Sequence, residues 1–267
     1  MLIPFGPRPW PRAALGPEAF GRAQSRAQDV RNRTYGPKDL VRSHSPAGCH
    51  MATIVQKISI SVIPILLAII LHEVSHGWVA DRLGDSTARY SGRLTLNPAA
   101  HIDLFGTIIL PLVLLLTTRG RFIFGYAKPV PINPYNLRNP RRDMIWISLS
   151  GILTNLALAA VSAISFRIMA SVSPGSWGLI ISPLMMMLWE SVRINIILAV
   201  FNAIPIPPLD GSRVLTRLLP PEQAAVFSKL EPYGFIVILL LVVTGMINFI
   251  WPVIRFFMVL FLGPYMI

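Results

Sequence analysis

The sequence is poor in charged residues, because Asp, Glu, Lys and Arg make up only 13% of its 267 residues. A soluble globular domain usually carries about 25%. A chain with so little charge cannot cover a folded core with a solvated surface, and 53% of the residues are hydrophobic. This composition excludes an ordinary soluble domain and predicts a protein that is embedded in a lipid bilayer.

Cysteine and acidic residues are also scarce. The single cysteine, Cys49, lies outside every apolar run and cannot form an intrachain disulfide. Lys and Arg outnumber Asp and Glu by 24 to 12, and in a soluble protein that excess would point to nucleic acid. Here the basic residues lie mainly at the N-terminus and between apolar runs, where they orient membrane helices. No aromatic–basic groove pattern accompanies them, so we expect no nucleic-acid partner.

The N-terminal residues 1–50 lack both an apolar period and the apolar stretch of about 7–15 residues that a secretory signal peptide needs. They are rich in arginine, proline and glycine, which predicts disorder. Met51 stands directly before the first apolar run. We therefore expect Met51 to be the true start, residues 1–50 to be an upstream extension of the reading frame, and 51–267 to form the membrane-embedded domain.

Several apolar stretches approach the roughly 20 residues that a spanning helix needs. They cover about 54–79, 103–118, 144–172, 177–204 and 233–262. The second stretch is short and contains Pro111, and the last is interrupted by Pro252, so it can form two spans. The sequence predicts an all-α polytopic membrane protein with about five to six transmembrane helices.

The orientation of these spans follows from the placement of arginine and lysine in the connections. Basic residues occur in three connections, at 82–93, 138–142 and 213–229, whereas the connection at 173–177 carries no charge. We place the basic connections in the cytoplasm of a cell that holds the protein in its plasma or inner membrane. The chain must then return to the cytoplasm after 103–118, and the two prolines of 122–132 predict a short re-entrant extended or β loop there.

The first apolar stretch ends in His72-Glu73-Val74-Ser75-His76, an H-E-x-x-H motif. Positions i and i+4 share one face of a helix, so both imidazoles can bind one zinc ion, and Glu73 can accept a proton from a zinc-activated water. Charged residues inside a span cost at least about 2.5–3.5 kcal/mol each. The alternative is a helix end that reaches the interface, where these side chains are merely solvated.

A third zinc ligand is needed, and Asp210 in Pro207-Pro208-Leu209-Asp210-Gly211 is the best candidate. It follows the fourth apolar stretch, which runs from outside to inside like the first, so the topology brings it to the depth of His72 and His76. The prolines end the helix and can turn Asp210 inward, and Gly211 permits close backbone approach. The alternative is a plain Pro-Asp-Gly turn.

With these motifs the sequence resembles the site-2 protease family of intramembrane zinc metalloproteases over most of residues 55–215. The resemblance rests on the motifs at 72–76, 92–98, 101–107, 125–134 and 208–211. It implies one catalytic Zn²⁺ ion held by His72, His76 and Asp210, with Glu73 as general base. The implied substrate is a transmembrane protein or peptide that is cut in or near its membrane segment. The competing functions are a catalytically silent membrane scaffold and a zinc transporter or sensor.

The stretch Ser150-Gly151-Ile152-Leu153-Thr154-Asn155 resembles a family motif that usually reads Ala-Gly-Pro-x-x-Asn. This sequence has Ser150 in place of the alanine and Ile152 in place of the proline. The resemblance implies that Asn155 lies near the scissile carbonyl or the substrate backbone. From chemistry alone, a hydrogen bond between helices is an equally good role for it. We expect His101 and Asp103 to support loops rather than bind metal, and Glu190 and Arg193 to pair with each other within the bundle.

Overall fold

The computed structural model describes residues 50–117, 125–171 and 178–263. The chain divides into two units, Met1–Ala47 and Gly48–Ile267, and every described residue belongs to the second. The predicted N-terminal extension and the uncharged connection at 172–177 therefore lie outside the described residues. The same is true of residues 118–124, which include the first part of the predicted re-entrant loop.

The described residues confirm the all-α prediction, since they contain helices and no strand. The α-helices are α3 (His50–Arg82), α4 (Thr87–Tyr90), α5 (Leu110–Thr117), α6 (Pro140–Ser171), α7 (Gly178–Asn202), α8 (Asp210–Leu218), α9 (Pro221–Ser228), α10 (Gly234–Val243) and α11 (Trp251–Leu262). A π-helix, η2 (Leu104–Ile109), leads into α5. Short 3-10 turns are η1 (Pro98–Ala100), η3 (Pro134–Asn136), η5 (Glu231–Tyr233) and η6 (Met246–Ile250).

Helices long and apolar enough to cross a membrane occur at Ser59–Arg82, Pro140–Ser171, Ile180–Asn202 and Pro221–Leu241, and a shorter apolar helix covers Met246–Leu262. The chain is therefore a membrane protein. Within the described residues α5 has only 8 residues, and residues 125–133 have neither helix nor strand. The count of five to six spans and the complete re-entrant loop stay predictions.

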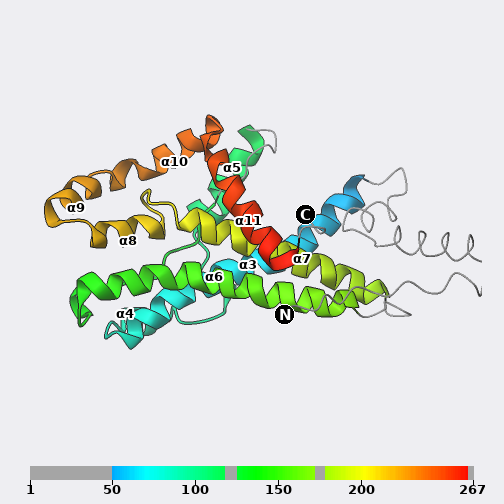
Figure 1. Cartoon of the computed structure of the whole chain (residues 1–267), viewed down its shortest axis with the longest axis horizontal. Coiled ribbons are helices and arrows are strands. Elements are labelled where there is room, and N and C mark those ends of the chain that lie inside the picture. The colour runs from blue at the N-terminus through cyan, green and yellow to red at the C-terminus, as the bar shows by residue number, and fades with distance from the viewer. Residues whose placement is uncertain (1–49, 118–124, 172–177, 264–267) are drawn as a thin grey trace, which may run out of the picture. The chain divides into compact units, whose positions relative to one another are not determined.

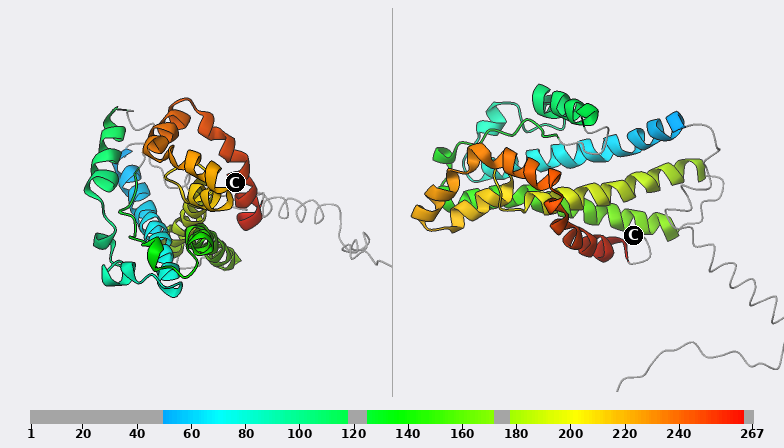
Figure 2. Two further views of the ribbon diagram at one scale, coloured as in Figure 1. Left: turned by 90° about the vertical axis from the view of Figure 1, so that its left-hand side faces the viewer. Right: turned by 90° about the horizontal axis from the view of Figure 1, so that it is seen from above.

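Helices α3, α6 and α7 lie side by side and form the central bundle of the second unit (Figures 1 and 2). Helix α6 runs antiparallel to the other two and also packs against α8 (Figure 1). It begins at Pro140, which suits a first helical turn, and Asp143 accepts a hydrogen bond from the Asn139 amide at 2.8 Å. Helix α7 ends at Asn202, just before the prolines that predicted this break.

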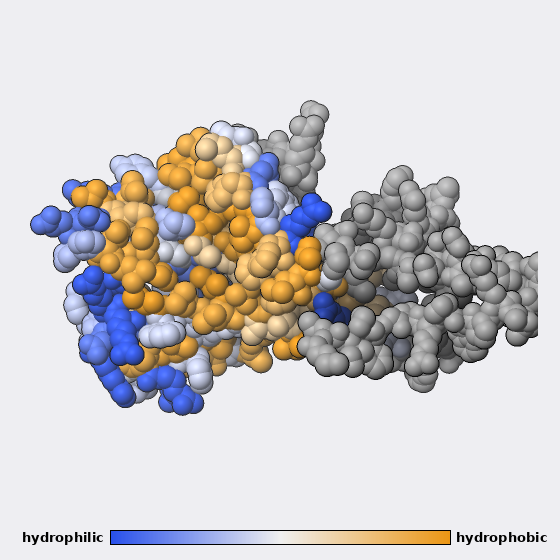
Figure 3. Space-filling view, viewed as in Figure 1, coloured by the Kyte–Doolittle hydropathy of each residue, from blue (hydrophilic) through white to orange (hydrophobic). Residues whose placement is uncertain are grey.

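Polar side chains gather at the end of this bundle where α3 stops and α6 starts (Figure 3). The half-exposed Trp78 on α3 and Trp146 on α6 lie at the same level there, because the His76 side chain contacts the Ile147 carbonyl. Tryptophans at one level of a bundle mark a membrane–water interface. The two tryptophans therefore favour an interface at this level of α3 and α6.

Asp85, just past the end of α3, fixes the connection that leads to α6. Its carboxylate is fully buried and accepts hydrogen bonds from the amides of Thr87 and Asn133, the Thr87 hydroxyl and the Asn136 side chain. Burial would raise the pKa of this carboxyl, but the bonds from Thr87, Asn136 and Asn133 outweigh it and hold the pKa below its usual range. Asp85 therefore stays ionised and ties residues 133–136 to α3.

Glu190 and Arg193 form the predicted ion pair near the middle of α7. Two guanidinium nitrogens of Arg193 donate to Glu190 Oε2 at 2.7 and 2.9 Å. Both residues belong to the same helix at i and i+3, so no neighbouring helix is needed to neutralise them.

Candidate metal centre

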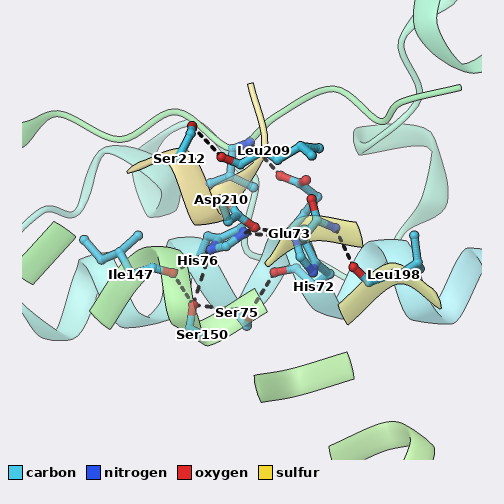
Figure 4. Close-up of polar contacts among 12 residues, drawn as sticks. His72, Glu73, Ser75, His76, Ile147, Ser150, Leu198, Leu209, Asp210 and Ser212 are labelled. Carbon is cyan, nitrogen blue, oxygen red and sulfur yellow. Dashed lines mark hydrogen bonds and ion pairs between the residues drawn. The ribbon is translucent and has the colours of Figure 1, made fainter. Parts of the chain in front are cut away.

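His72 and His76 are stacked one turn apart on α3 and point to the same side. Both are buried, with 7% and 5% of their surface exposed, and their Nε2 atoms are 3.1 Å apart. Figure 4 shows the two imidazoles directed at Asp210. The helical spacing of the motif thus produces the convergence that the sequence predicted.

Asp210 is brought to the histidines by the break between α7 and α8. Its Oδ2 atom lies 3.1 Å from His72 Nε2 and 3.2 Å from His76 Nε2, and 7% of its surface is exposed. The adjacent Gly211 has no room for a side chain, because an added Cβ would lie 2.3 Å from the Ala203 carbonyl oxygen. The predicted close backbone approach at Gly211 is confirmed.

The contacts of His76 set its tautomer. Its Nδ1 atom lies 2.6 Å from the Ile147 carbonyl oxygen, which can only accept, so Nδ1 carries the proton and Nε2 presents a lone pair. Ser150 lies beside this contact, 3.3 Å from His76 Nδ1, and donates to the same carbonyl at 2.7 Å. A backbone acceptor behind a histidine in this way orients it for metal binding.

The three side chains fit a divalent metal ion. Their ligand atoms all lie within 4.8 Å of one another, and the buried Asp210 Oδ2 has no hydrogen-bond donor among the described residues. A carboxylate oxygen that faces the unprotonated Nε2 of His76 is favourable only if a cation lies between them. Two nitrogens and one carboxylate oxygen are a ligand set typical of zinc with an open fourth position.

Glu73 lies beside this cluster without joining it (Figure 4). Its Oε2 atom accepts a hydrogen bond from the Val130 amide at 3.1 Å, and the residue is half-buried. One carboxylate oxygen is thus held by the segment at 125–133, which comes from a distant part of the sequence. That contact was not predicted from the sequence.

Gly151 on α6 is a second feature that sequence analysis missed. A Cβ added there would lie 2.5 Å from His72 Cε1 and 2.6 Å from His76 Cε1 and Nε2. The two imidazoles therefore occupy the space that any other residue would fill. Two signals were available: its place in the stretch 150–155 that resembles a family motif, and its position in the middle of an apolar helix, where glycine is unfavourable without a packing reason.

Asn155 lies one helical turn beyond Gly151 on the same face of α6. It is fully buried, and neither Oδ1 nor Nδ2 has a hydrogen-bond partner among the described residues. The alternative role, a hydrogen bond between helices, is absent from that part of the chain. Since buried polar groups are nearly always paired, this carboxamide needs a partner that the described residues do not supply.

His101 and Asp103 serve loops, as predicted. His101 Nε2 lies 2.9 Å from the Thr95 carbonyl, and Asp103 accepts the Gly106 amide at 2.7 Å, capping η2. Neither residue belongs to the metal-ligand cluster among the described residues.

The fold and the site together define a membrane protein with a metalloprotease-type centre. The comparisons agree. The chain is 36% identical over 203 residues to the Bacillus subtilis protein named "Putative zinc metalloprotease YwhC", an alignment that covers 73% of this chain and 85% of the relative. It belongs to the same family of zinc metalloproteases, and zinc is its cofactor.

Two further relatives carry the same description in their names. Rip2 of Mycolicibacterium smegmatis is 27% identical over 187 residues, covering 68% of this chain and 66% of the relative. MJ0611 of Methanocaldococcus jannaschii is 32% identical over 162 residues, covering 58% and 69%. No family model and no solved structure matches the chain.

Proposed function

We propose that this protein is a site-2-type intramembrane zinc metalloendopeptidase, which hydrolyses a peptide bond in or near a transmembrane segment of a membrane-protein substrate. The observation that carries the proposal is the position of the site: His72, Glu73 and His76 lie inside the candidate span Ser59–Arg82, and Asp210 joins them. His72 precedes Trp78 by six residues, about 9 Å along the helix axis. The reaction then takes place below the membrane surface.

In this proposal His72, His76 and Asp210 hold one catalytic zinc ion. Zinc at such a site polarises the scissile carbonyl and acidifies water. Glu73 is adjacent to the first ligand but is not itself a ligand, so it takes the proton from the attacking water and delivers it to the leaving amine. The Asn155 carboxamide donates to the substrate backbone beside the scissile bond, which would satisfy its unpaired amide.

We further propose that the protein lies in the plasma or inner membrane with this site toward the cytoplasm. The support is the cluster of basic connections at the α3–α6 end of the bundle, since lysine and arginine are retained on the cytoplasmic side. Tyr135 is 95% exposed at that end. In a variant lacking Cys49, a cysteine introduced at Tyr135 should react with an impermeant maleimide only after the cells are permeabilised. Labelling in intact cells would show that this end of the bundle lies outside the cell and would contradict the proposed orientation.

The catalytic proposal is tested by comparing the purified wild type with Glu73→Gln on a single-span test substrate, with zinc measured in the same samples. We expect the variant to retain zinc and to lose cleavage by about 100-fold or more, because general-base catalysis contributes about 10²–10⁴-fold. Glu222→Gln, which changes an exposed acid on α9, is the matched control and should cut like wild type.

The competing functions give different outcomes in the same samples. A catalytically silent scaffold would bind zinc and cut no member of a panel of single-span substrates. A zinc transporter would move zinc across reconstituted vesicles. In that case neither wild type nor Glu73→Gln would cut the substrate. Cleavage by wild type that Glu73→Gln fully retains would remove Glu73 from the mechanism.

A further inference from the structure

Arg93 is a buried cation that joins the turn at 98–100 to the segment at 125–133. Only 7% of its surface is exposed, and its guanidinium donates to the carbonyl oxygens of Ala100, Lys128 and Pro129. The bond to Lys128 measures 2.5 Å and the bond to Pro129 measures 3.2 Å. One side chain therefore joins two stretches of backbone that are far apart in the sequence.

The charge of Arg93 has no carboxylate within ion-pair distance among the described residues. A buried charge is unfavourable unless hydrogen bonds satisfy it. Here backbone carbonyls bind Nη1 and Nη2, and Nε has no partner among the described residues. The planar fork of a guanidinium can reach carbonyls on two segments at once, which the single ammonium of a lysine cannot do in the same geometry. The arrangement indicates that the backbone which Arg93 holds must be fixed in place.

The held backbone leads directly to Glu73. The Lys128 amide donates to the His101 carbonyl at 2.9 Å, and the Val130 amide donates to Glu73 Oε2 at 3.1 Å. The Val130 side chain is buried over Gly77 of α3, where an added Cβ would lie 2.9 Å from Val130 Cγ1. Arg93 thus binds the two carbonyls that immediately precede the amide held by Glu73.

We propose that Arg93 is a positioning residue for the general base, an inference that rests on the proposed function. By fixing the Lys128–Val130 backbone, Arg93 holds the Val130 amide where it orients the Glu73 carboxylate beside the metal ligands. A base displaced by about 1 Å can lower the rate roughly 100-fold without a change in any ligand. Arg93 acts through Glu73, so its loss should lower kcat and leave KM and zinc content unchanged.

The test uses the full-length protein and the single-span substrate, with kcat, KM, zinc content and thermal stability measured for each variant. Arg93→Met keeps the length of the side chain and removes the guanidinium. Val130→Pro removes the amide hydrogen that Glu73 accepts. We expect each change to lower kcat by about 10- to 100-fold with KM within about threefold of wild type. The double variant should lose no more kcat than the more strongly affected single variant.

Two matched controls separate this role from general disturbance. Arg142→Met removes an exposed arginine near the start of α6. Ala127→Pro places a proline in the same segment, at an amide that donates to no acceptor among the described residues. Both should retain kcat.

The result that would overturn the inference is a wild-type kcat in zinc-loaded Arg93→Met, or losses that multiply in the double variant, or a change confined to KM. If Arg93→Met fails to fold, Val130→Pro decides: an unchanged kcat there also overturns the inference. A wild type that cuts no substrate would instead refute the proposed function, so the two failures are distinguishable.

Discussion

Replacing Asp210 by alanine is expected to yield a folded protein that binds zinc at least about 100-fold more weakly and cleaves at background level. Loss of a mere supporting contact around a metal typically weakens binding by about 10–100-fold, and loss of a direct ligand should exceed that. Asp210 Oδ2 lies within 3.2 Å of both histidine Nε2 atoms, so its removal leaves two neutral ligands. Zinc content after dialysis against graded chelator measures the effect.

The control for this prediction is Asp103→Asn, which alters an acid that caps η2 and lies outside the metal cluster. That variant should keep its zinc. An Asp210→Ala protein that binds zinc as tightly as wild type would exclude Asp210 as a ligand and leave the two histidines without a third partner.

Gly151→Ala should abolish zinc binding and cleavage although glycine has no functional group. The added methyl would lie within 2.6 Å of both imidazole rings. Without metal the rings can rotate away from it, but with metal they must converge, so the clash falls on the zinc-bound form. Overpacking of this kind costs about 1–3 kcal/mol when the neighbouring side chains can adjust. Two imidazoles fixed by a metal ion cannot adjust, so the cost in the zinc-bound form should be higher.

Although Gly151→Ala should lose zinc, its metal-free form should not lose thermal stability. Alanine is favoured over glycine inside a helix by about 0.5–1 kcal/mol, so the metal-free variant should melt no lower than metal-free wild type. Leu153→Ala, an exposed position on the same helix, is the control and should retain zinc. Full zinc content in Gly151→Ala would show that the cradle tolerates a side chain.

The metal centre could be predicted from the sequence because its geometry is local or topological. His72 and His76 converge through helical spacing alone, which no tertiary context needs to supply. The prediction of Asp210 as the third ligand needed one further inference, that the first and fourth apolar stretches cross the membrane in the same direction. The placement of arginine in the connections supplied that inference. The helical secondary structure was equally predictable, since the apolar runs are long and the prolines after α7 indicate where that helix ends.

The support of the site could not be predicted, because it depends on contacts between residues far apart in the chain. The Val130 amide on Glu73 joins positions separated by 57 residues, and the Ile147 carbonyl on His76 joins positions separated by 71. Backbone groups are identical in every residue, so the sequence does not mark which of them bind a side chain. Gly151 was equally hidden, since its role is the absence of a side chain.

The Glu190–Arg193 pair has a consequence for how the chain enters the bilayer during synthesis. Each lone charge at the centre of a span costs about 2.5–3.5 kcal/mol on insertion. Because the two residues are a turn apart on one helix, the charges neutralise each other as soon as that turn forms, before α7 packs against another helix. Helix α7 therefore carries its own counter-ion into the bilayer and does not depend on another helix to supply one.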